Sequence, residues 1–128
     1  MVEEKQNNTR VFNQPAGHLE EGETLLAAVI RETREESAWQ FCPEAIVGIY
    51  RWVHPELKHT YLRVSYTGSV EQHDSEQALD DGILSAQWLS REELLKQPLR
   101  SPMVMRCIDD YLAGHRYPLS LCDDVFNN

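Results

Sequence analysis

The segment from residue 24 to residue 37 has the pattern of an amphipathic helix, and this pattern constrains what the rest of the chain can form. Its acidic side carries three residues within one helical turn, at i, i+3 and i+4: Glu32, Glu35 and Glu36. Another side gathers Leu26, Ile30 and Thr33. A helix of this kind buries one side against a sheet and leaves its acidic side facing a cleft, so the chain must also supply strands.

Strand-like runs lie on both sides of this helix in the sequence. The runs at residues 10–13, 46–53 and 61–70 are enriched in β-branched and aromatic residues, and a fourth covers residues 85–89. Each run is long enough for one strand of a sheet. Strands interleaved with helices predict an α+β fold of the α/β/α sandwich type.

Two further helices are predicted after the strands. One begins at Ser90, because Ser90 and Glu93 have the spacing of a capping box. The other follows Ser101, which can cap it, and Pro102, which suits a first turn; Gly114 suits its end. Just before the first of these helices stands Trp88, which we expect to pack in the core because large aromatic side chains dominate core packing.

Length and charge narrow the classes of protein further. A chain of 128 residues is long enough for one hydrophobic core, so we expect a single domain over residues 1–128. It contains no apolar run long enough for a bilayer and no signal peptide, which predicts a cytoplasmic protein. A formal charge of −9 disfavours binding to a nucleic-acid polymer. The same charge would repel a small phosphorylated ligand unless a divalent metal supplied local positive charge.

The acidic side of the helix is a candidate metal site. Like charges at these spacings cost an isolated helix about 0.2 to 0.5 kcal/mol per pair, whereas clustered carboxylate oxygens suit Mg²⁺. A merely solvated acidic surface is the competing interpretation. The preceding loop favours the metal, because Pro15 and Gly17 allow a tight turn in which carbonyl oxygens can face an ion.

The spacing of these residues resembles the Nudix box. The match consists of Gly17, Glu23 and residues 31–36, which read Arg-Glu-Thr-Arg-Glu-Glu. The resemblance implies a Nudix fold, with a mixed β-sheet between helices, and a hydrolase that acts on phosphate anhydrides. Two positions depart from the pattern: Thr33 stands where an aliphatic residue is usual, and Ala38 stands where glycine usually ends the helix. Because a left-handed residue other than glycine costs about 1 to 2 kcal/mol, we expect the helix to end by another geometry.

The resemblance also implies roles for these residues. The three glutamates of the helix and the carbonyl of Gly17 hold divalent ions, Mg²⁺ or alternatively Mn²⁺. Arg31 orients the catalytic carboxylates through a pair with Glu23. One of the three glutamates, or a residue of a later loop, acts as general base for the attacking water.

A finer resemblance concerns the branch of NudJ-type phosphatases. It rests on residues 12–20, which lead into the box, and on residues 100–102 and 114–119 near the end of the chain. It implies release of orthophosphate from nucleoside di- and triphosphates and from pyrophosphorylated thiamine precursors. The partners are then small phosphorylated metabolites, and the protein is a monomer or a homodimer.

Other features leave alternatives open. Arg51 and Arg63 lie on different predicted strands and either bind substrate phosphates or are ordinary surface residues. Residues 1–4 read like the end of a strand, and the family usually has more chain before Gly17, so we expect an N-terminally truncated domain with an open sheet edge. From another class, a Nudix-fold module that binds a phosphorylated ligand without cleaving it remains the alternative to an enzyme.

Overall fold

The computed structural model describes residues 1–126, whose strands form two antiparallel sheets. The smaller sheet has the order β2-β1-β5 and contains β1 (Val2–Gln6), β2 (Thr9–Asn13) and β5 (Ile83–Ala86). β2 matches its predicted run, whereas β5 is shifted toward the N-terminus relative to residues 85–89. The sequence therefore located both strands, although the boundaries of β5 were wrong.

The second sheet is a long ribbon of two strands. β3 (Gln40–Val53) pairs with β4 (Thr60–Glu71), so both strands are longer than the runs predicted for them. Parallel pairing, which a mixed sheet requires, is limited within residues 1–126 to an isolated bridge between Phe12 and Leu99. The α+β class predicted from the order of elements is confirmed.

The predicted capping box starts the second helix, whereas the third has Pro102 at its N-cap and not the predicted Ser101. In α1 (Leu25–Ser37) the Thr24 hydroxyl accepts the N–H of Ala27 at 3.0 Å. In α2 (Arg91–Leu94) both bonds of the predicted capping box between Ser90 and Glu93 are present. α3 (Met103–Leu112) and a short 3-10 helix, η1 (Leu119–Leu121), complete the described elements.

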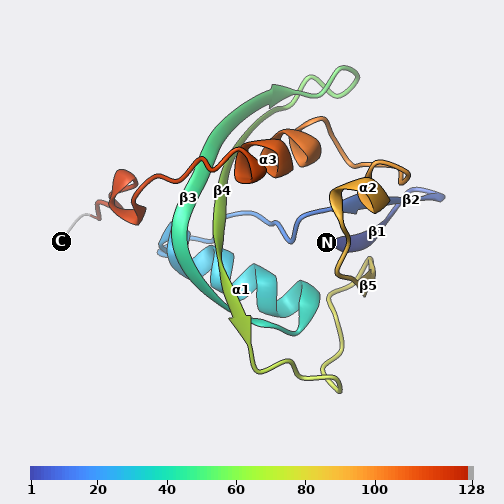
Figure 1. The fold of residues 1–128 in the computed structure, drawn as a ribbon, viewed down its shortest axis with the longest axis horizontal. Coiled ribbons are helices and arrows are strands. Elements are labelled where there is room, and N and C mark those ends of the chain that lie inside the picture. The colour runs from blue at the N-terminus through green and yellow to red at the C-terminus, as the bar shows by residue number, and fades with distance from the viewer. Residues whose placement is uncertain (127–128) are drawn as a thin grey trace.

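Helices α1 and α3 lie between the two sheets in Figure 1, with the β3–β4 ribbon on one side and the three-stranded sheet on the other. α1 contacts both β3 and β5, and α3 contacts β3. A core of Phe12, Leu94 and Val104 joins β2, α2 and α3. This packing fixes the ends of the loop between β2 and α1, which passes beside the acidic side of α1. Within residues 1–126, no helix is long and apolar enough to span a membrane.

The first residues belong to a fully paired strand. β1 extends the segment 1–4 that the sequence marked as strand, and it pairs with β2 on one side and β5 on the other. Its amide and carbonyl groups therefore face partners on both sides, and the edges of this sheet are β2 and β5. The truncated start expected from the sequence stays a prediction.

Helix α1 ends in a left-handed residue despite having no glycine at that position. Ala38 has φ 63° and ψ 16°, and its N–H donates to the carbonyl of Arg34 at 2.8 Å. The expectation of a different helix end was therefore wrong. The methyl group of Ala38 is buried, and its carbonyl accepts the N–H of Asp74 at 3.0 Å. Burial and this hydrogen bond offset a conformational cost of about 1 to 2 kcal/mol.

Trp88 does not pack in the core, contrary to the prediction. Its side chain is 74% exposed and meets Trp39 edge to face, with ring centroids 6.0 Å apart. The reason is that β5 ends at Ala86, so the chain has left the sheet before Trp88. Leu89 and Leu94 fill the core in its place.

Substitution of Gly68 tests how closely β3 and β4 approach each other. A Cβ on Gly68 would lie 2.0 Å from the carbonyl oxygen of Cys42, next to a register shift between Pro43 and Ala45. We expect Gly68→Ala to lower the free energy of unfolding by about 1 to 3 kcal/mol, because the backbone must move to admit the methyl group. Urea unfolding is the measurement, and Ser69→Ala on the same strand is the control. Equal midpoints for the two variants would contradict this close approach.

Candidate active site

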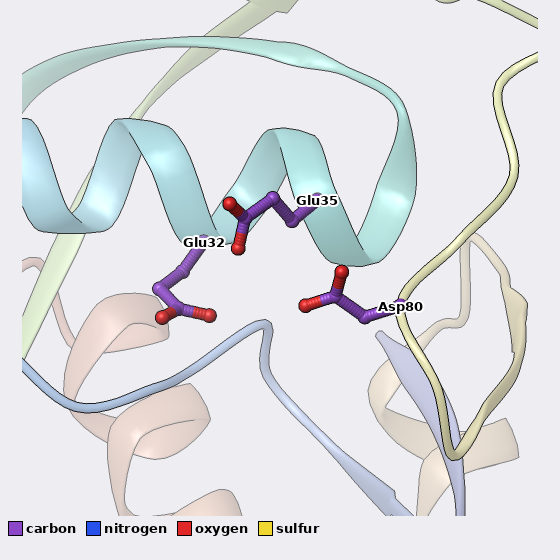
Figure 2. Close-up of side chains that lie close together, drawn as sticks. All are labelled: Glu32, Glu35 and Asp80. Carbon is purple, nitrogen blue, oxygen red and sulfur yellow. The ribbon is translucent and has the colours of Figure 1, made fainter.

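Three carboxylates converge beside α1 (Figure 2). Glu32 and Glu35 project from α1 toward Asp80, which lies in the loop between β4 and β5. One carboxylate oxygen of each residue lies within 4.8 Å of the others. The N–H of Asp80 donates to the carbonyl of Glu35 at 3.0 Å, which ties this loop to α1. We call these three residues the carboxylate cluster.

Sequence reasoning missed Asp80. Its loop, residues 71–82, contains several acidic residues without any helical or strand spacing, so no pattern distinguished one from another. Only the expectation that a residue of a later loop joins the site pointed in this direction. Its position depends on the hydrogen bond to Glu35, which the sequence does not reveal.

Glu36 lies near the carboxylate cluster but is buried against the loop before α1. Its side chain is only 4% exposed, and its two oxygens each lie 3.2 Å from the N–H of Ala16. Burial raises the pKa of Glu36 to about 8, and the nearby charge of Glu32 acts in the same direction. The structure thus brings two of the three predicted glutamates together with Asp80 and places the third against the loop before α1.

Arg31 connects the loop to the carboxylate cluster. Its Nε and one terminal nitrogen donate to the two oxygens of Glu23 at 2.7 and 2.9 Å, a bidentate pair. Its other terminal nitrogen donates to Glu32 at 2.7 Å and to Glu35 at 3.2 Å. The guanidinium holds the pKa of Glu23 down to about 2. Arg31 therefore fixes the orientation of two cluster carboxylates while Glu23 fixes Arg31.

Gly17 lies against one carboxylate of the cluster. A Cβ at this position would lie 2.1 Å from the carboxyl carbon of Glu32. Any side chain at this position would displace Glu32. The observed position of Glu32 therefore requires glycine at residue 17. Near it, the loop also presents the carbonyl of His18 to Arg31 at 3.2 Å.

The two predicted phosphate-binding arginines lie on opposite faces of the β3–β4 ribbon. Arg63 is paired with Tyr50, whereas Arg51 is paired with Leu62, and neighbouring residues of a strand face opposite sides. Arg51 is exposed. Arg63 donates to Asn13 at 3.0 Å and to Gln14 at 2.9 Å, beside the loop that leads to Gly17. The two arginines therefore point to different sides of the ribbon.

The carboxylate cluster has the composition of a site for a hard divalent cation. Its donors are all oxygens, and oxygens bound to Mg²⁺ on opposite sides lie about 4.2 Å apart, twice a bond length of about 2.1 Å. The separations in the cluster are therefore close to those an ion would impose. Arg31 offsets only part of the negative charge of the cluster. The residues present fit a divalent metal.

The family of the chain follows from a comparison of its sequence with family models. A model described as the NUDIX domain matches residues 1–107. The chain belongs to the Nudix family. The carboxylate cluster, Arg31 and Gly17 all lie within the matched residues, and members of this family act on small phosphorylated compounds with a divalent metal.

Individual relatives agree with the family assignment. The chain is 40% identical to Phosphatase NudJ of Shigella boydii serotype 4 over 125 residues, which covers 97% of this chain and 81% of the relative. It is 39% identical over the same length to Phosphatase NudJ of Escherichia coli strain K12. A solved NUDIX hydrolase from Nitrosomonas europaea superimposes with a TM-score of 0.94 at 42% identity, covering 97% of this chain and 86% of that one. The Nudix fold and the resemblance to NudJ phosphatases are confirmed. The chain is a Nudix hydrolase that acts on phosphorus-containing compounds, which favours the enzyme over the binding module.

Gly17→Ala tests the contact between the loop and the cluster. We expect loss of most hydrolytic activity with a small change in melting temperature, because the methyl group displaces only the end of the flexible Glu32 side chain. Gly114→Ala is the control: no atom lies within 4 Å of the added Cβ, but its φ of 87° strains any side chain. That variant should lose stability and keep its activity per folded molecule. Full activity in Gly17→Ala would contradict the proposed geometry.

The raised pKa of Glu36 predicts that the stability of the metal-free protein depends on pH. A folded-state pKa raised from 4.5 to about 8 contributes stability that is fully present below about pH 4.5 and is lost as the pH rises through about 8. With chelator present, the melting temperature of wild type should therefore fall more steeply than that of Glu36→Gln between about pH 5 and pH 8. Glu92→Gln, an exposed change in α2, should follow wild type. Parallel curves for wild type and Glu36→Gln would contradict the burial of a titrating carboxyl.

Proposed function

We propose that this Nudix hydrolase uses Mg²⁺ to cleave a phosphate-anhydride bond in a nucleoside di- or triphosphate, or in a pyrophosphorylated metabolite of the thiamine type. The carboxylate cluster carries this proposal, since it supplies clustered oxygen donors in an acidic protein that must still bind phosphate. The NudJ phosphatases, which cover nearly the whole chain at about 40% identity, support orthophosphate as a product.

The metal ligands in this proposal are Glu32, Glu35, Glu36 and the carbonyl of Gly17. Bound Mg²⁺ supplies charge neutralisation of the phosphates and a lower pKa for the attacking water. Glu32 and Glu35 are already convergent. Glu36 lies in the same turn, and a cation nearby would favour its ionised form against the effect of burial.

The remaining residues position the ligands and accept the proton. Arg31 orients Glu32 and Glu35, and Glu23 orients Arg31, as their hydrogen bonds indicate. Asp80 joins the cluster from its own loop, so it can serve as a further ligand or as the base that takes a proton from water. Arg63 lies beside the loop of Gly17 and is the arginine that we assign to substrate binding. Because Arg51 lies on the other face of the ribbon, we assign it no contact with the same substrate.

The direct test is a phosphate-release assay with a panel of nucleotides and thiamine diphosphate, with Mg²⁺ and with chelator. We expect release only with the metal. Glu35→Gln and Asp80→Asn should each lower kcat/KM, the former by about a hundredfold or more, because a lost ligand removes several kcal/mol of charge stabilisation. Glu92→Gln changes a carboxylate outside the cluster and should be neutral. Folded wild-type protein without metal-dependent release from any substrate would overturn the proposal.

Metal binding is testable without turnover. A ligand that binds only the folded state stabilises it by RT ln(1 + [L]/Kd), about 2.7 kcal/mol at a hundredfold excess over Kd. Mg²⁺ should therefore raise the melting temperature of wild type, and Glu35→Gln should lose much of that increment. Its stability in chelator should be equal to wild type or slightly higher, since one repulsive charge is gone. Equal metal-induced shifts in the two proteins would show that the cluster does not bind the metal and is an ordinary solvated acidic surface.

A further inference from the structure

A groove lies where the turn between β3 and β4 faces the chain that leads into α3. It is open, with a volume of about 520 Å³, and a smaller recess of about 90 Å³ adjoins it. The groove and the recess share four lining residues: Trp52, His54, Arg100 and Ser101. Tyr61 and Arg63 line the recess. We call the two together the ring groove, for the aromatic side chains of its wall.

The wall of the ring groove is a preformed aromatic surface. Trp52 and Tyr61 are direct cross-strand partners, and their rings stack with centroids 5.8 Å apart at 30°. His54 meets Trp52 edge to face at 5.3 Å. The Nδ1 atom of His54 accepts the N–H groups of Glu56 and Leu57, so the ring of His54 is fixed by its own turn. Rings held in this way offer an aromatic surface without a large ordering cost.

Two arginines and His54 supply hydrogen-bond donors around this wall, and Glu56 and Gln6 supply acceptors. A guanidinium has five N–H groups and no acceptor. Arg63 uses two of its terminal nitrogens toward Asn13 and Gln14, and Arg100 uses one toward Glu4, so each retains further N–H groups among the described contacts. Since the Nδ1 of His54 is an acceptor, a neutral His54 carries its proton on Nε2 and adds another donor. A ring with carbonyl oxygens suits such a groove.

The ring groove is connected to the carboxylate cluster by a short stretch of chain. Arg63 is bonded to Gln14, and Gly17, three residues later, lies against Glu32. Three extended residues span at most about 11 Å, which limits the distance between Gln14 and Gly17. A ligand that carries a ring at one end and phosphates at the other matches this arrangement.

We propose that the ring groove binds the heteroaromatic ring of the substrate, stacked on Trp52, while its phosphates reach the carboxylate cluster. The ligand class is an uncharged ring with carbonyl acceptors, as in a nucleobase. This inference rests on the proposed hydrolysis and adds to it the part of the protein that selects the substrate. The aromatic wall and the donors around it determine ring selection, and the metal ligands determine the chemistry.

The test compares a substrate that has such a ring with one that has none. Uridine triphosphate and inorganic tripolyphosphate are measured with wild type, Trp52→Leu and the matched control Trp88→Leu, whose exposed ring lies outside the groove. If tripolyphosphate is not cleaved, its affinity is measured as competitive inhibition. We expect Trp52→Leu to lower kcat/KM for uridine triphosphate about tenfold, mainly through KM, because base–aromatic stacking is worth about 1 to 3 kcal/mol. Tripolyphosphate should change less than twofold, and Trp52→Phe should restore most of the loss.

The outcomes separate the two proposals. Wild type without metal-dependent turnover of any phosphate would overturn the proposed function, and this inference with it. Active wild type in which Trp52→Leu affects both compounds equally, or neither, would overturn the inference alone. An equal loss on both would instead indicate that the groove binds phosphate. If Trp52→Leu does not fold, Tyr61→Leu decides in its place, with the same selective loss expected.

Discussion

The bidentate pair between Arg31 and Glu23 is the interaction on which the site depends. One guanidinium, mostly shielded from solvent, binds Glu23 with two nitrogens and reaches Glu32 and Glu35 with the third. Without it, neighbouring carboxylates on α1 would repel each other and turn toward water. With it, the loop before the helix and the helix itself hold one geometry. A planar, permanently charged fork performs this task, which an ammonium group on a flexible chain would perform poorly.

This interaction also links the two sheets. The loop that supplies Glu23 begins at the end of β2 in the small sheet, and α1 packs on β3 of the long ribbon and on β5. Asp80 comes from the chain that connects the ribbon to β5, and it is tied to the last turns of α1 by a backbone hydrogen bond. The carboxylate cluster therefore forms only when both sheets are in place. Arg63 also links the two sheets, because its side chain on β4 of the ribbon donates hydrogen bonds to residues 13 and 14.

Local signals predicted the elements well. Ser90 and Glu93 cap α2 as expected, because capping depends on residues within one turn of each other. Positions that depend on distant packing were predicted poorly. Trp88 is exposed because β5 ends before it, and Ala38 adopts a left-handed conformation because its surroundings compensate the cost. Neither reason can be read from neighbouring residues.

The sequence by itself determined the helical turn that carries Glu32, Glu35 and Glu36 and the spacing of Gly17, Glu23 and Arg31, because these are relations within one helix and its loop. Only the tertiary structure decided which carboxylates meet. It buried Glu36 against the N–H of Ala16 and brought Asp80, 45 positions after Glu35, close to Glu32 and Glu35. It also placed Arg51 and Arg63 on opposite faces, through the register of β3 and β4. Register and loop placement are set by contacts between residues far apart in the chain, and a single sequence shows no trace of them in local spacing.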